Sequence, residues 1–254
     1  MPATTSQVVL DHIAIGTRTL ADGWALFGRL LGGRWAYGGD SPGYWWGQLT
    51  FAAGAKIELL TPTGGPDAAF LERFLATRDA GPHHFNFIVP DIIDSLERVR
   101  SLGIEPVQVN LDNPNWKEAF LHPKSVFGIV VQIAQQAVEP VAPPPPDLPE
   151  PGEPTTFAAA EHHVDDLDGA VRLFGDALGG RRIDGADAGP DRVLLQWANG
   201  ARLRLVQSTE SSRHGGGLRH LEFARADASF TPADRAEIDG LAARLGVMVQ
   251  LHGD

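Results

Sequence analysis

Residues 81–91 read Gly-Pro-His-His-Phe-Asn-Phe-Ile-Val-Pro-Asp, which predicts a β-strand that carries two adjacent histidines and leads into a helix. Successive residues of a strand point to opposite faces of a sheet. We therefore expect His84 and Asn86 to share one face and His83 to lie on the other. An imidazole and an amide on one face of an apolar strand are residue types that bind metal ions or small oxygenated ligands.

Three further apolar segments each place one metal-competent residue near mid-strand. Residues 10–15 (Leu-Asp-His-Ile-Ala-Ile) contain His12, residues 56–60 (Lys-Ile-Glu-Leu-Leu) contain Glu58, and residues 129–133 (Ile-Val-Val-Gln-Ile) contain Gln132. Taken singly, each has a simpler interpretation: a lone strand histidine is more often a hydrogen-bonded core residue, and a mid-strand glutamate usually faces solvent. The four together predict strands that converge on one ion.

The composition is that of a globular protein, with 43% hydrophobic and 21% charged residues in a chain of 254. A net charge of -11 argues against nucleic acid or an anionic membrane as a partner, and no apolar run is long enough to span a membrane. The chain has no cysteine, which excludes disulfides and thiolate zinc sites. We expect a cytoplasmic protein that binds a small molecule.

Turn signals and apolar periodicity predict an α+β fold made of repeated β-α-β-β-β modules. Leu20, Trp24, Phe27 and Leu31 form the apolar stripe of the first helix, with Thr17 or Thr19 as its N-cap. The first predicted module has strands at 8–16, 34–38, 44–51 and 55–61, with a helix between the first two strands that ends near 31. A short helix at 68–77 connects it to the second module. The second module has strands at 83–89, 106–111, 117–121 and 127–134, with a helix at 91–102 after its first strand.

A proline-rich stretch at 138–154 predicts a stiff, extended linker between two domains, residues 1–137 and 155–254. Beyond it the first module recurs: Leu26-Phe27-Gly28 and the following Leu-Gly-Gly-Arg at 31–34 are repeated at 173–175 and 178–181. The repeat predicts a second copy of the fold, with the chain ending before its last strands.

The second copy lacks the candidate ligands of the first. Ala159 stands where His12 stands and Arg204 where Glu58 stands, and the strand that would answer Gln132 is expected to be missing, although His220 answers His84. A guanidinium cannot coordinate a cation. We therefore expect a degenerate second domain without a metal site. The histidine pair at 162–163 aligns with Ile15-Gly16 and is interpreted as structural.

The sequence resembles the vicinal oxygen chelate superfamily in the segments that carry the candidate ligands. These segments are residues 10–15, 56–62, 83–91 and 128–132, together with residues 120–125 (Phe-Leu-His-Pro-Lys-Ser). This superfamily includes glyoxalase I, methylmalonyl-CoA epimerase, extradiol dioxygenases and bleomycin-resistance proteins, and the epimerase and glyoxalase I branch is the most similar. The resemblance implies tandem modules that form cupped mixed sheets around a divalent metal. Carried over by position, the ligands are His12, Glu58, His84 and Gln132.

Two departures from the epimerase pattern follow from the same alignment of motifs. The epimerases have an amide where this chain has Glu58 and a carboxylate where it has Gln132. Their other catalytic glutamate falls near Trp45-Trp46-Gly47, where this chain has no acid. The proton-transferring carboxylate is therefore expected to be Glu58, with Glu118 as a second choice.

Two imidazoles, a carboxylate and an amide oxygen suit one Fe, Mn, Co, Ni or Zn dication. Four protein ligands on an octahedral ion leave two positions for a substrate that chelates through two oxygens. Asn86, Trp46 and Trp116 are predicted to contact that substrate, beside the polar centre. For Gln132 an alternative stays open: its amide can instead hydrogen-bond to a water molecule that is itself a ligand of the metal.

Three functions are compatible with these residues. The first is a metal-dependent lyase or isomerase of the glyoxalase type that stabilises an enolate or enediolate. The second is an Fe(II) dioxygenase of the extradiol type, and the third is a non-enzymatic protein that binds a small molecule or antibiotic. The chain is expected to act as a monomer with pseudo-dimeric domains or as a homodimer.

Overall fold

The computed structural model describes residues 7–138, 142–184, 189–208, 217–225 and 230–252. The chain forms two compact units, each assembled from separated segments: residues 1–11, 84–139 and 159–219 make one, and residues 12–83, 140–158 and 220–254 make the other. Phe85, Phe87, Phe174 and Trp197 pack together in the first unit. Phe27, Phe51, Phe157 and Phe223 do so in the second.

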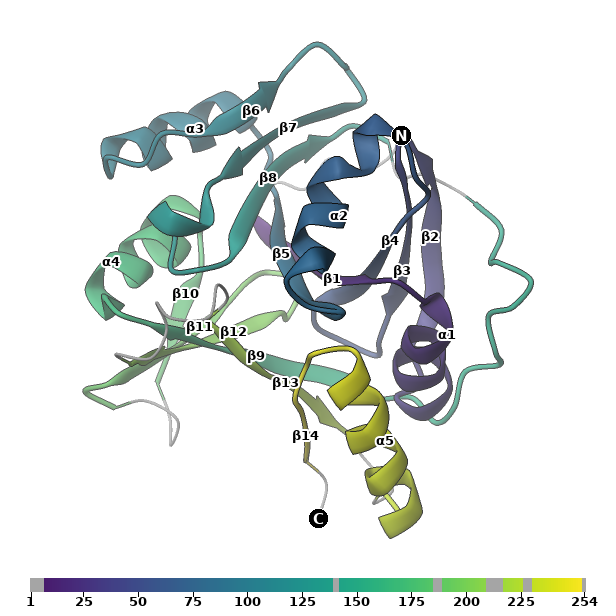
Figure 1. Cartoon of the computed structure of the whole chain (residues 1–254). Helices are drawn as coiled ribbons and strands as arrows, with labels where there is room; N and C mark the ends of the chain where they lie inside the picture. Colours follow the sequence, from purple (N-terminus) through teal and green to yellow (C-terminus); the bar gives the residue numbers. More distant parts are fainter. Residues whose placement is uncertain (1–6, 139–141, 185–188, 209–216, 226–229, 253–254) are drawn as a thin grey trace. The chain divides into compact units, whose positions relative to one another are not determined.

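The order of elements confirms the α+β class and the repeated modules (Figure 1). The first module comprises β1 (Val9–Thr17), α1 (Leu20–Gly23) with η1 (Trp24–Leu30), β2 (Arg34–Ser41), β3 (Tyr44–Thr50) and β4 (Lys56–Pro62). After η2 (Pro66–Ala68) and α2 (Ala69–Ala76), the second comprises β5 (Ala80–Ile88), α3 (Ile92–Ser101), β6 (Val107–Asn110), β7 (Trp116–Leu121), η3 (Pro123–Ser125) and β8 (Val130–Gln136).

The second half of the chain repeats this plan in shorter form. It comprises β9 (Thr156–Val164), α4 (Leu167–Val171) with η4 (Arg172–Ala177), β10 (Arg181–Ile183), β11 (Arg192–Gln196), β12 (Arg202–Gln207), β13 (Leu218–Ala224), α5 (Pro232–Arg244) and β14 (Val249–His252). Among the described residues, no helix has the length and hydrophobicity needed to cross a bilayer.

The strands form two mixed sheets. The eight-stranded sheet has the order β2-β3-β4-β1-β5-β8-β7-β6, and the six-stranded sheet has the order β10-β11-β12-β9-β13-β14. Within each module the first strand pairs in parallel with the last, as β1 does with β4 and β5 with β8, while the hairpin strands are antiparallel. This parallel pairing sets which residues of neighbouring strands share a face.

The repeated Leu-Phe-Gly motif marks a π-helical segment in both halves. Thr19 caps α1, as one of the two predicted N-caps, but the helix continues from Trp24 as a π-helix rather than an α-helix. The backbone N–H of Leu31 donates to the carbonyl of Leu26, and that of Leu178 donates to Leu173, each over 3.0 Å. A bond to the fifth preceding residue is the π-helical pattern, so the repeat reflects a shared local geometry.

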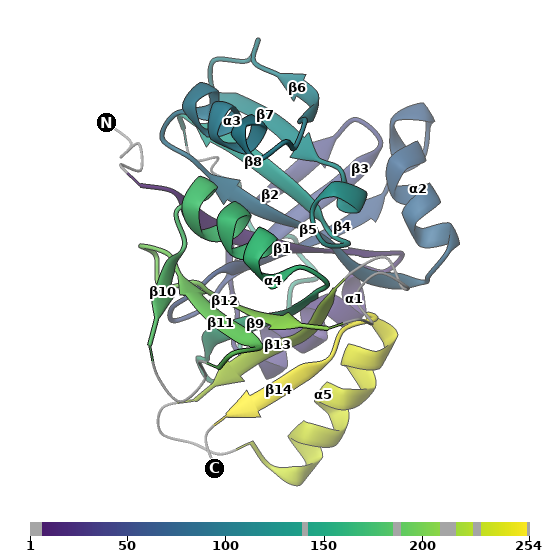
Figure 2. The ribbon, with the colours of Figure 1, turned by 90° about the vertical axis from the view of Figure 1, so that its left-hand side faces the viewer.

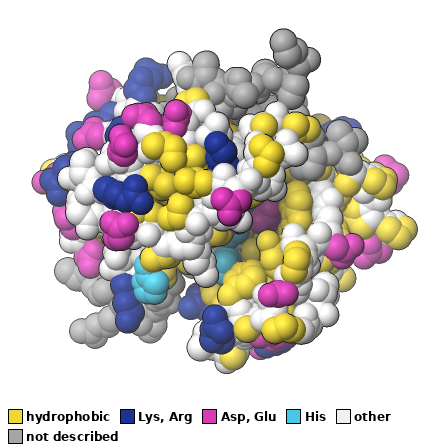
Figure 3. Space-filling model, turned by 90° about the horizontal axis from the view of Figure 1, so that it is seen from above, with side chains coloured by type: hydrophobic (Ala, Val, Ile, Leu, Met, Phe, Trp, Pro, Cys, Tyr) yellow, Lys and Arg dark blue, Asp and Glu magenta, His cyan; other side chains and the backbone are white. Residues whose placement is uncertain are grey.

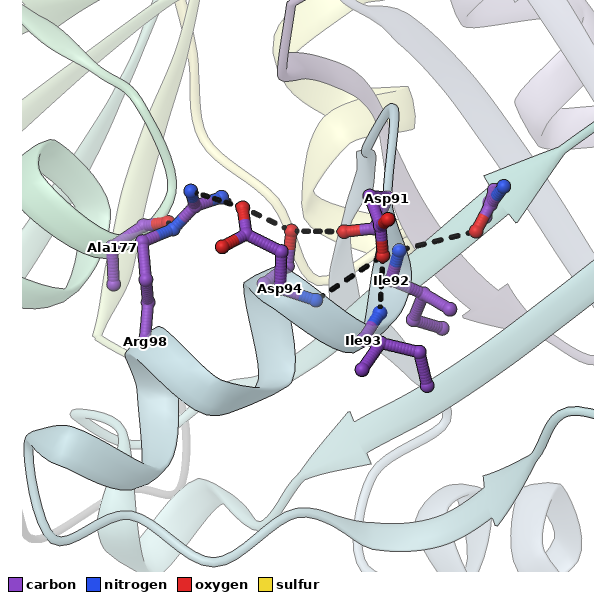
Figure 4. Close-up of polar contacts among 8 residues, drawn as sticks. Asp91, Ile92, Ile93, Asp94, Arg98 and Ala177 are labelled. Atoms are coloured by element: carbon purple, nitrogen blue, oxygen red, sulfur yellow. Dashed lines mark hydrogen bonds and ion pairs between the residues drawn. The ribbon is translucent and has the colours of Figure 1, made fainter.

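Helix α3 begins where the Pro-Asp signal predicts (Figure 4). The Asp91 carboxylate accepts hydrogen bonds from the backbone N–H groups of Ile93 and Asp94, which are among the unpaired donors of a helix start. On the same helix, Arg98 pairs with Asp94 and donates from Nε to the carbonyl of Ala177 over 3.1 Å. The cap thus fixes a helix that also contacts the end of η4 within the same unit.

One expectation about the second half is wrong. A strand that answers β8 is present: β14 lies beside β13 in parallel, with Gln250 opposite Glu222, as Gln132 lies opposite Asn86 in the first half. The helix α5 leads directly into β14, and both views show the two side by side (Figure 1, Figure 2). The chain reaches this position without the two intervening hairpin strands.

The described part of the linker, residues 142–154, forms neither helix nor strand. It is held at its start by the Trp35 indole, which donates to the carbonyl of Ala142 over 2.8 Å. Residues 139–141 of the predicted linker, and residues 1–6 of the predicted first domain, lie outside the described residues. The domain boundary at the linker stays a prediction.

Candidate metal centre

His12 and Glu58 lie on the same face of the sheet because of the register between β1 and β4. Glu58 is opposite Ala14, and His12 comes two residues before Ala14 in the same strand. Both side chains are buried, with 2% of the His12 surface and 6% of the Glu58 surface exposed. His12 Nε2 and Glu58 Oε1 are 3.5 Å apart, which is too long for a good hydrogen bond but a usual separation for two ligands of one ion.

His84 completes a group of three buried residues whose potential ligand atoms all lie within 4.8 Å of one another. Two atoms that each bind one ion at about 2.1 Å are between about 3 and 4.2 Å apart, so small side-chain rotations bring this group to binding distances. Two neutral imidazoles and one carboxylate are a donor set that first-row divalent metals accept. The group His12, Glu58 and His84 can therefore hold one metal ion.

Gln48 is a buried contact of this group that the sequence did not single out. It lies in β3 directly opposite Glu58, and 3% of its surface is exposed. Its Nε2 donates to Glu58 Oε2 over 2.7 Å and lies 3.1 Å from His12 Nδ1. Its Oε1 is buried without a hydrogen-bond partner among the described residues. One amide group thus contacts two of the predicted ligands.

Gln132, the predicted fourth ligand, lies in β8 with both ends of its amide in hydrogen bonds. Its Nε2 donates to Glu118 Oε2 over 2.8 Å, and its Oε1 accepts from Asn86 Nδ2 over 2.8 Å. An amide oxygen has two lone pairs, so the bond from Asn86 leaves one for a second partner. Ligation of a metal by Gln132 stays a prediction.

The remaining predicted contact residues lie in two different settings. Asn86 is fully buried beside Gln132. Trp116 is half-buried and donates from Nε1 to Glu118 Oε2 over 2.9 Å. Trp46 is half-buried in β3, where it packs edge-on against Tyr37 and against the cluster of Ala14, Leu60, Leu71 and Leu75. Glu118, the second choice for the proton-transferring carboxylate, is therefore a hydrogen-bond partner of Gln132 and Trp116.

Two other histidines are surrounded by aromatic rings. His83 lies on the face opposite to His84 and contacts Phe74 and Phe70, with ring centroids 4.9 and 5.6 Å away. Burial, with a smaller effect of the Arg78 charge, lowers the pKa of His83 to about 4. His162 packs against Phe85, and its burial lowers its pKa to about 3. Both therefore remain neutral core residues at neutral pH.

The second half of the chain has an ion pair where the first half has a candidate ligand. Arg204 lies opposite Glu161 in β12 and β9, the register in which Glu58 lies opposite Ala14. Arg204 Nη1 is 3.6 Å from Glu161 Oε2, and His163 Nε2 is 2.9 Å from Glu161 Oε1.

On the surface drawn in Figure 3, acidic and basic side chains are interspersed among the described residues.

Comparison with known proteins gives a family match for the first half of the chain. Residues 11–120 match the model of the Glyoxalase/Bleomycin resistance protein/Dioxygenase superfamily. No curated protein matches the sequence at a significant level.

Comparison with solved structures gives further matches. A triple mutant of 4-hydroxymandelate synthase from Streptomyces coelicolor matches with a TM-score of 0.59 and 13% identity, over 94% of this chain and 76% of the synthase. Methylmalonyl-CoA epimerase from Mycobacterium tuberculosis matches with a TM-score of 0.46 and 20% identity, over 54% of this chain and 93% of the epimerase. A Streptomyces coelicolor epimerase variant in complex with 2-nitronate-propionyl-CoA has a TM-score of 0.45 and 21% identity, covering 52% of this chain and 100% of its own. The match to the synthase shows a similar fold over both halves of the chain.

Proposed function

We propose that the chain, whose residues 11–120 match the model of the Glyoxalase/Bleomycin resistance protein/Dioxygenase superfamily, is a divalent-metal-dependent enzyme of the glyoxalase type, a lyase or isomerase. The observation that carries the proposal is the group of His12, Glu58 and His84, three buried side chains whose ligand atoms lie within 4.8 Å of one another. Gln132 is the proposed fourth ligand. The substrate is a small molecule that chelates through two oxygens.

A bound dication supplies the Lewis acid that polarises a carbonyl and favours an anionic enolate or enediolate. The protein supplies the remaining functions. Glu58 is the proposed proton acceptor, and the Gln48 amide fixes its carboxylate through the 2.7 Å hydrogen bond to Oε2. Glu118 is the second candidate for the proton acceptor, and its carboxylate is held by hydrogen bonds from Trp116 Nε1 and Gln132 Nε2.

The three ligands also support a second candidate, an Fe(II) dioxygenase of the extradiol type. Two histidines and one carboxylate are the ligand set of the facial triad that non-haem iron oxygenases use. Metal identity and a requirement for O₂ separate this candidate from the lyase or isomerase.

The first experiment is metal analysis of the purified full-length chain, followed by calorimetric titration of the chelator-treated protein with Mn²⁺, Co²⁺ and Zn²⁺. We expect one ion per chain and loss of binding in His84→Ala. Absence of stoichiometric metal, with ligand binding that survives chelation, would instead favour the third candidate, a protein that sequesters a small molecule.

The second experiment measures turnover without oxygen. The metal-loaded protein is given 2-hydroxy and 2-oxo carbonyl compounds in deuterated water, and exchange at the carbon next to the carbonyl is followed by NMR. Exchange under anaerobic conditions that stops on chelation supports the lyase or isomerase. Consumption of O₂ with catechol, and no exchange, supports the dioxygenase.

A further inference from the structure

Four side chains from β5, β7 and β8 form a continuous series of hydrogen bonds. Trp116 Nε1 and Gln132 Nε2 both donate to Glu118 Oε2, over 2.9 and 2.8 Å. Asn86 Nδ2 donates to Gln132 Oε1 over 2.8 Å. All four residues belong to the same compact unit, and the series ends at Asn86, whose side chain has 0% of its surface exposed.

The direction of every bond in this series follows from the chemistry of its first member. An indole N–H can only donate, so Glu118 Oε2 is an acceptor. Gln132 must therefore turn its NH₂ group to Glu118 and its oxygen to Asn86. Asn86 must in turn present its NH₂ group to Gln132, and its Oδ1 is left over. This orientation does not depend on the ambiguity between amide oxygen and nitrogen that affects isolated side chains.

Asn86 Oδ1 is buried and has no hydrogen-bond partner among the described residues. Leaving a buried acceptor unpaired is costly, so a donor from outside the protein is expected to satisfy it. Asn86 follows His84 by two residues in β5, and the two side chains share a face. A group that donates to Asn86 Oδ1 therefore lies next to a proposed metal ligand.

We propose that Asn86 Oδ1 accepts a hydrogen bond from a hydroxyl group of the chelating ligand, so that the site selects 2-hydroxy compounds over the matching 2-oxo compounds. This selectivity rests on the proposed metal-binding function. Glu118 and Gln132 are positioning residues: they orient Asn86 and need not touch the ligand. A water molecule offers the same O–H donor, and the experiment distinguishes it from a ligand hydroxyl.

The test compares L-lactate with pyruvate, two carboxylates of similar size that chelate through a carboxylate oxygen and its neighbouring oxygen. Only lactate carries a hydroxyl donor. Their dissociation constants are measured by calorimetry on the Zn²⁺-loaded full-length protein, on Asn86→Leu and on Glu118→Leu, which removes the acceptor that orients Gln132. We expect the preference for lactate to fall about fivefold in Asn86→Leu, the effect of one net hydrogen bond, and to fall in Glu118→Leu as well.

A preference that is unchanged in Asn86→Leu, or failure of the zinc-loaded protein to bind either compound, would overturn the proposal; an unchanged preference would leave water as the donor. Loss of affinity for both compounds by the same factor would indicate a structural role alone and would also contradict it. Failure of the wild type to bind Zn²⁺ would refute the proposed function instead.

A second measurement needs neither metal nor a folded variant. In metal-free wild-type protein labelled with ¹⁵N and ¹³C, we expect a through-hydrogen-bond coupling from Asn86 Nδ2 to the side-chain carbonyl of Gln132. A coupling in the reverse direction, from Gln132 Nε2 to the Asn86 carbonyl, would show that Asn86 does not present its oxygen to a ligand.

Discussion

Glu58 and Gln48 face each other across β4 and β3, and Gln48 Nε2 lies 2.7 Å from Glu58 Oε2. The second module pairs the same two residue types in the opposite order, with Glu118 on β7 and Gln132 on β8, 2.8 Å apart. Each module thus joins one carboxylate to one amide on its last two strands. The difference lies in the partners: the pair on β3 and β4 includes a residue of the metal-competent group, whereas Glu118 is not a member of that group.

We predict that Glu58→Gln weakens divalent metal binding by more than about 100-fold. Loss of a residue that only hydrogen-bonds to a metal ligand typically costs about 10- to 100-fold in metal affinity, and Glu58 is itself a proposed ligand. The change replaces the charged oxygen donor by a neutral amide and preserves the size of the side chain. Calorimetric titration with Mn²⁺ and Zn²⁺ measures the effect. Glu161→Gln is the matched control, because Glu161 lies in the second sheet and pairs with Arg204 and His163. Equal losses in the two variants would contradict the assignment.

Gln132→Leu tests the fourth ligand. We expect metal affinity to fall by about 10- to 100-fold and the visible spectrum of the Co²⁺ form to change, because an oxygen donor and two hydrogen bonds are removed. Gln135→Leu serves as the control: Gln135 is in the same strand but on the other face, where its Oε1 accepts from the backbone N–H of Ile92. An unchanged Co²⁺ spectrum in Gln132→Leu would mean that Gln132 only orients its neighbours.

The acid stability of the protein should depend on His162. Burial lowers the pKa of His162 to about 3 from an ordinary value of 6.5, so the unfolded chain takes up a proton below pH 6.5 that the folded chain does not. The free energy of unfolding should therefore fall with decreasing pH by about 1.4 kcal/mol per pH unit from this residue alone.

The variant His162→Phe removes the titrating group and keeps a ring among Phe85 and Phe174. Urea unfolding at several pH values between about 6 and 4.5 should give a shallower loss of stability for the variant than for the wild type, by about 1.4 kcal/mol per unit. Parallel curves for the two proteins would contradict the neutral, buried state of this histidine.

Asp91→Ala should lower the free energy of unfolding by about 1 kcal/mol, because the Asp91 carboxylate caps two backbone N–H groups of α3. Thermal or urea denaturation measures the change, and metal affinity is expected to stay the same. Asp91→Asn, which keeps an acceptor, should lose much less. A loss as large in Asp91→Asn would mean that the charge, not the cap, stabilises the helix.

Local patterns predicted most of the fold. Alternation in residues 83–89 placed His83 and His84 on opposite faces, and the structure confirms this, with His83 packed against Phe74 and His84 in the buried group. The Leu-Phe-Gly repeat predicted two similar helices, and their shared geometry is present. Its π-helical character was not predicted, because the apolar spacing of 3 and 4 residues is also that of an α-helix.

The missed features depend on register and on tertiary pairing. Gln48 contacts Glu58 because β3 pairs with β4 in a register that places the two residues opposite each other. The register of a hairpin depends on the geometry of its turn, which composition does not specify. The alternation of Tyr44, Trp46 and Gln48 on one face was the available signal. For β14 the signal was the short Val-Gln-Leu-His alternation at 249–252, which is easily taken for a frayed chain end.

The most direct test of the metal centre is a crystal structure of the Co²⁺- or Zn²⁺-loaded protein with anomalous data collected at the absorption edge of the metal. We predict a single peak per chain, at about 2.0 to 2.2 Å from His12, Glu58 and His84. A peak elsewhere in the chain, or none near these three side chains at full metal occupancy in solution, would contradict the account.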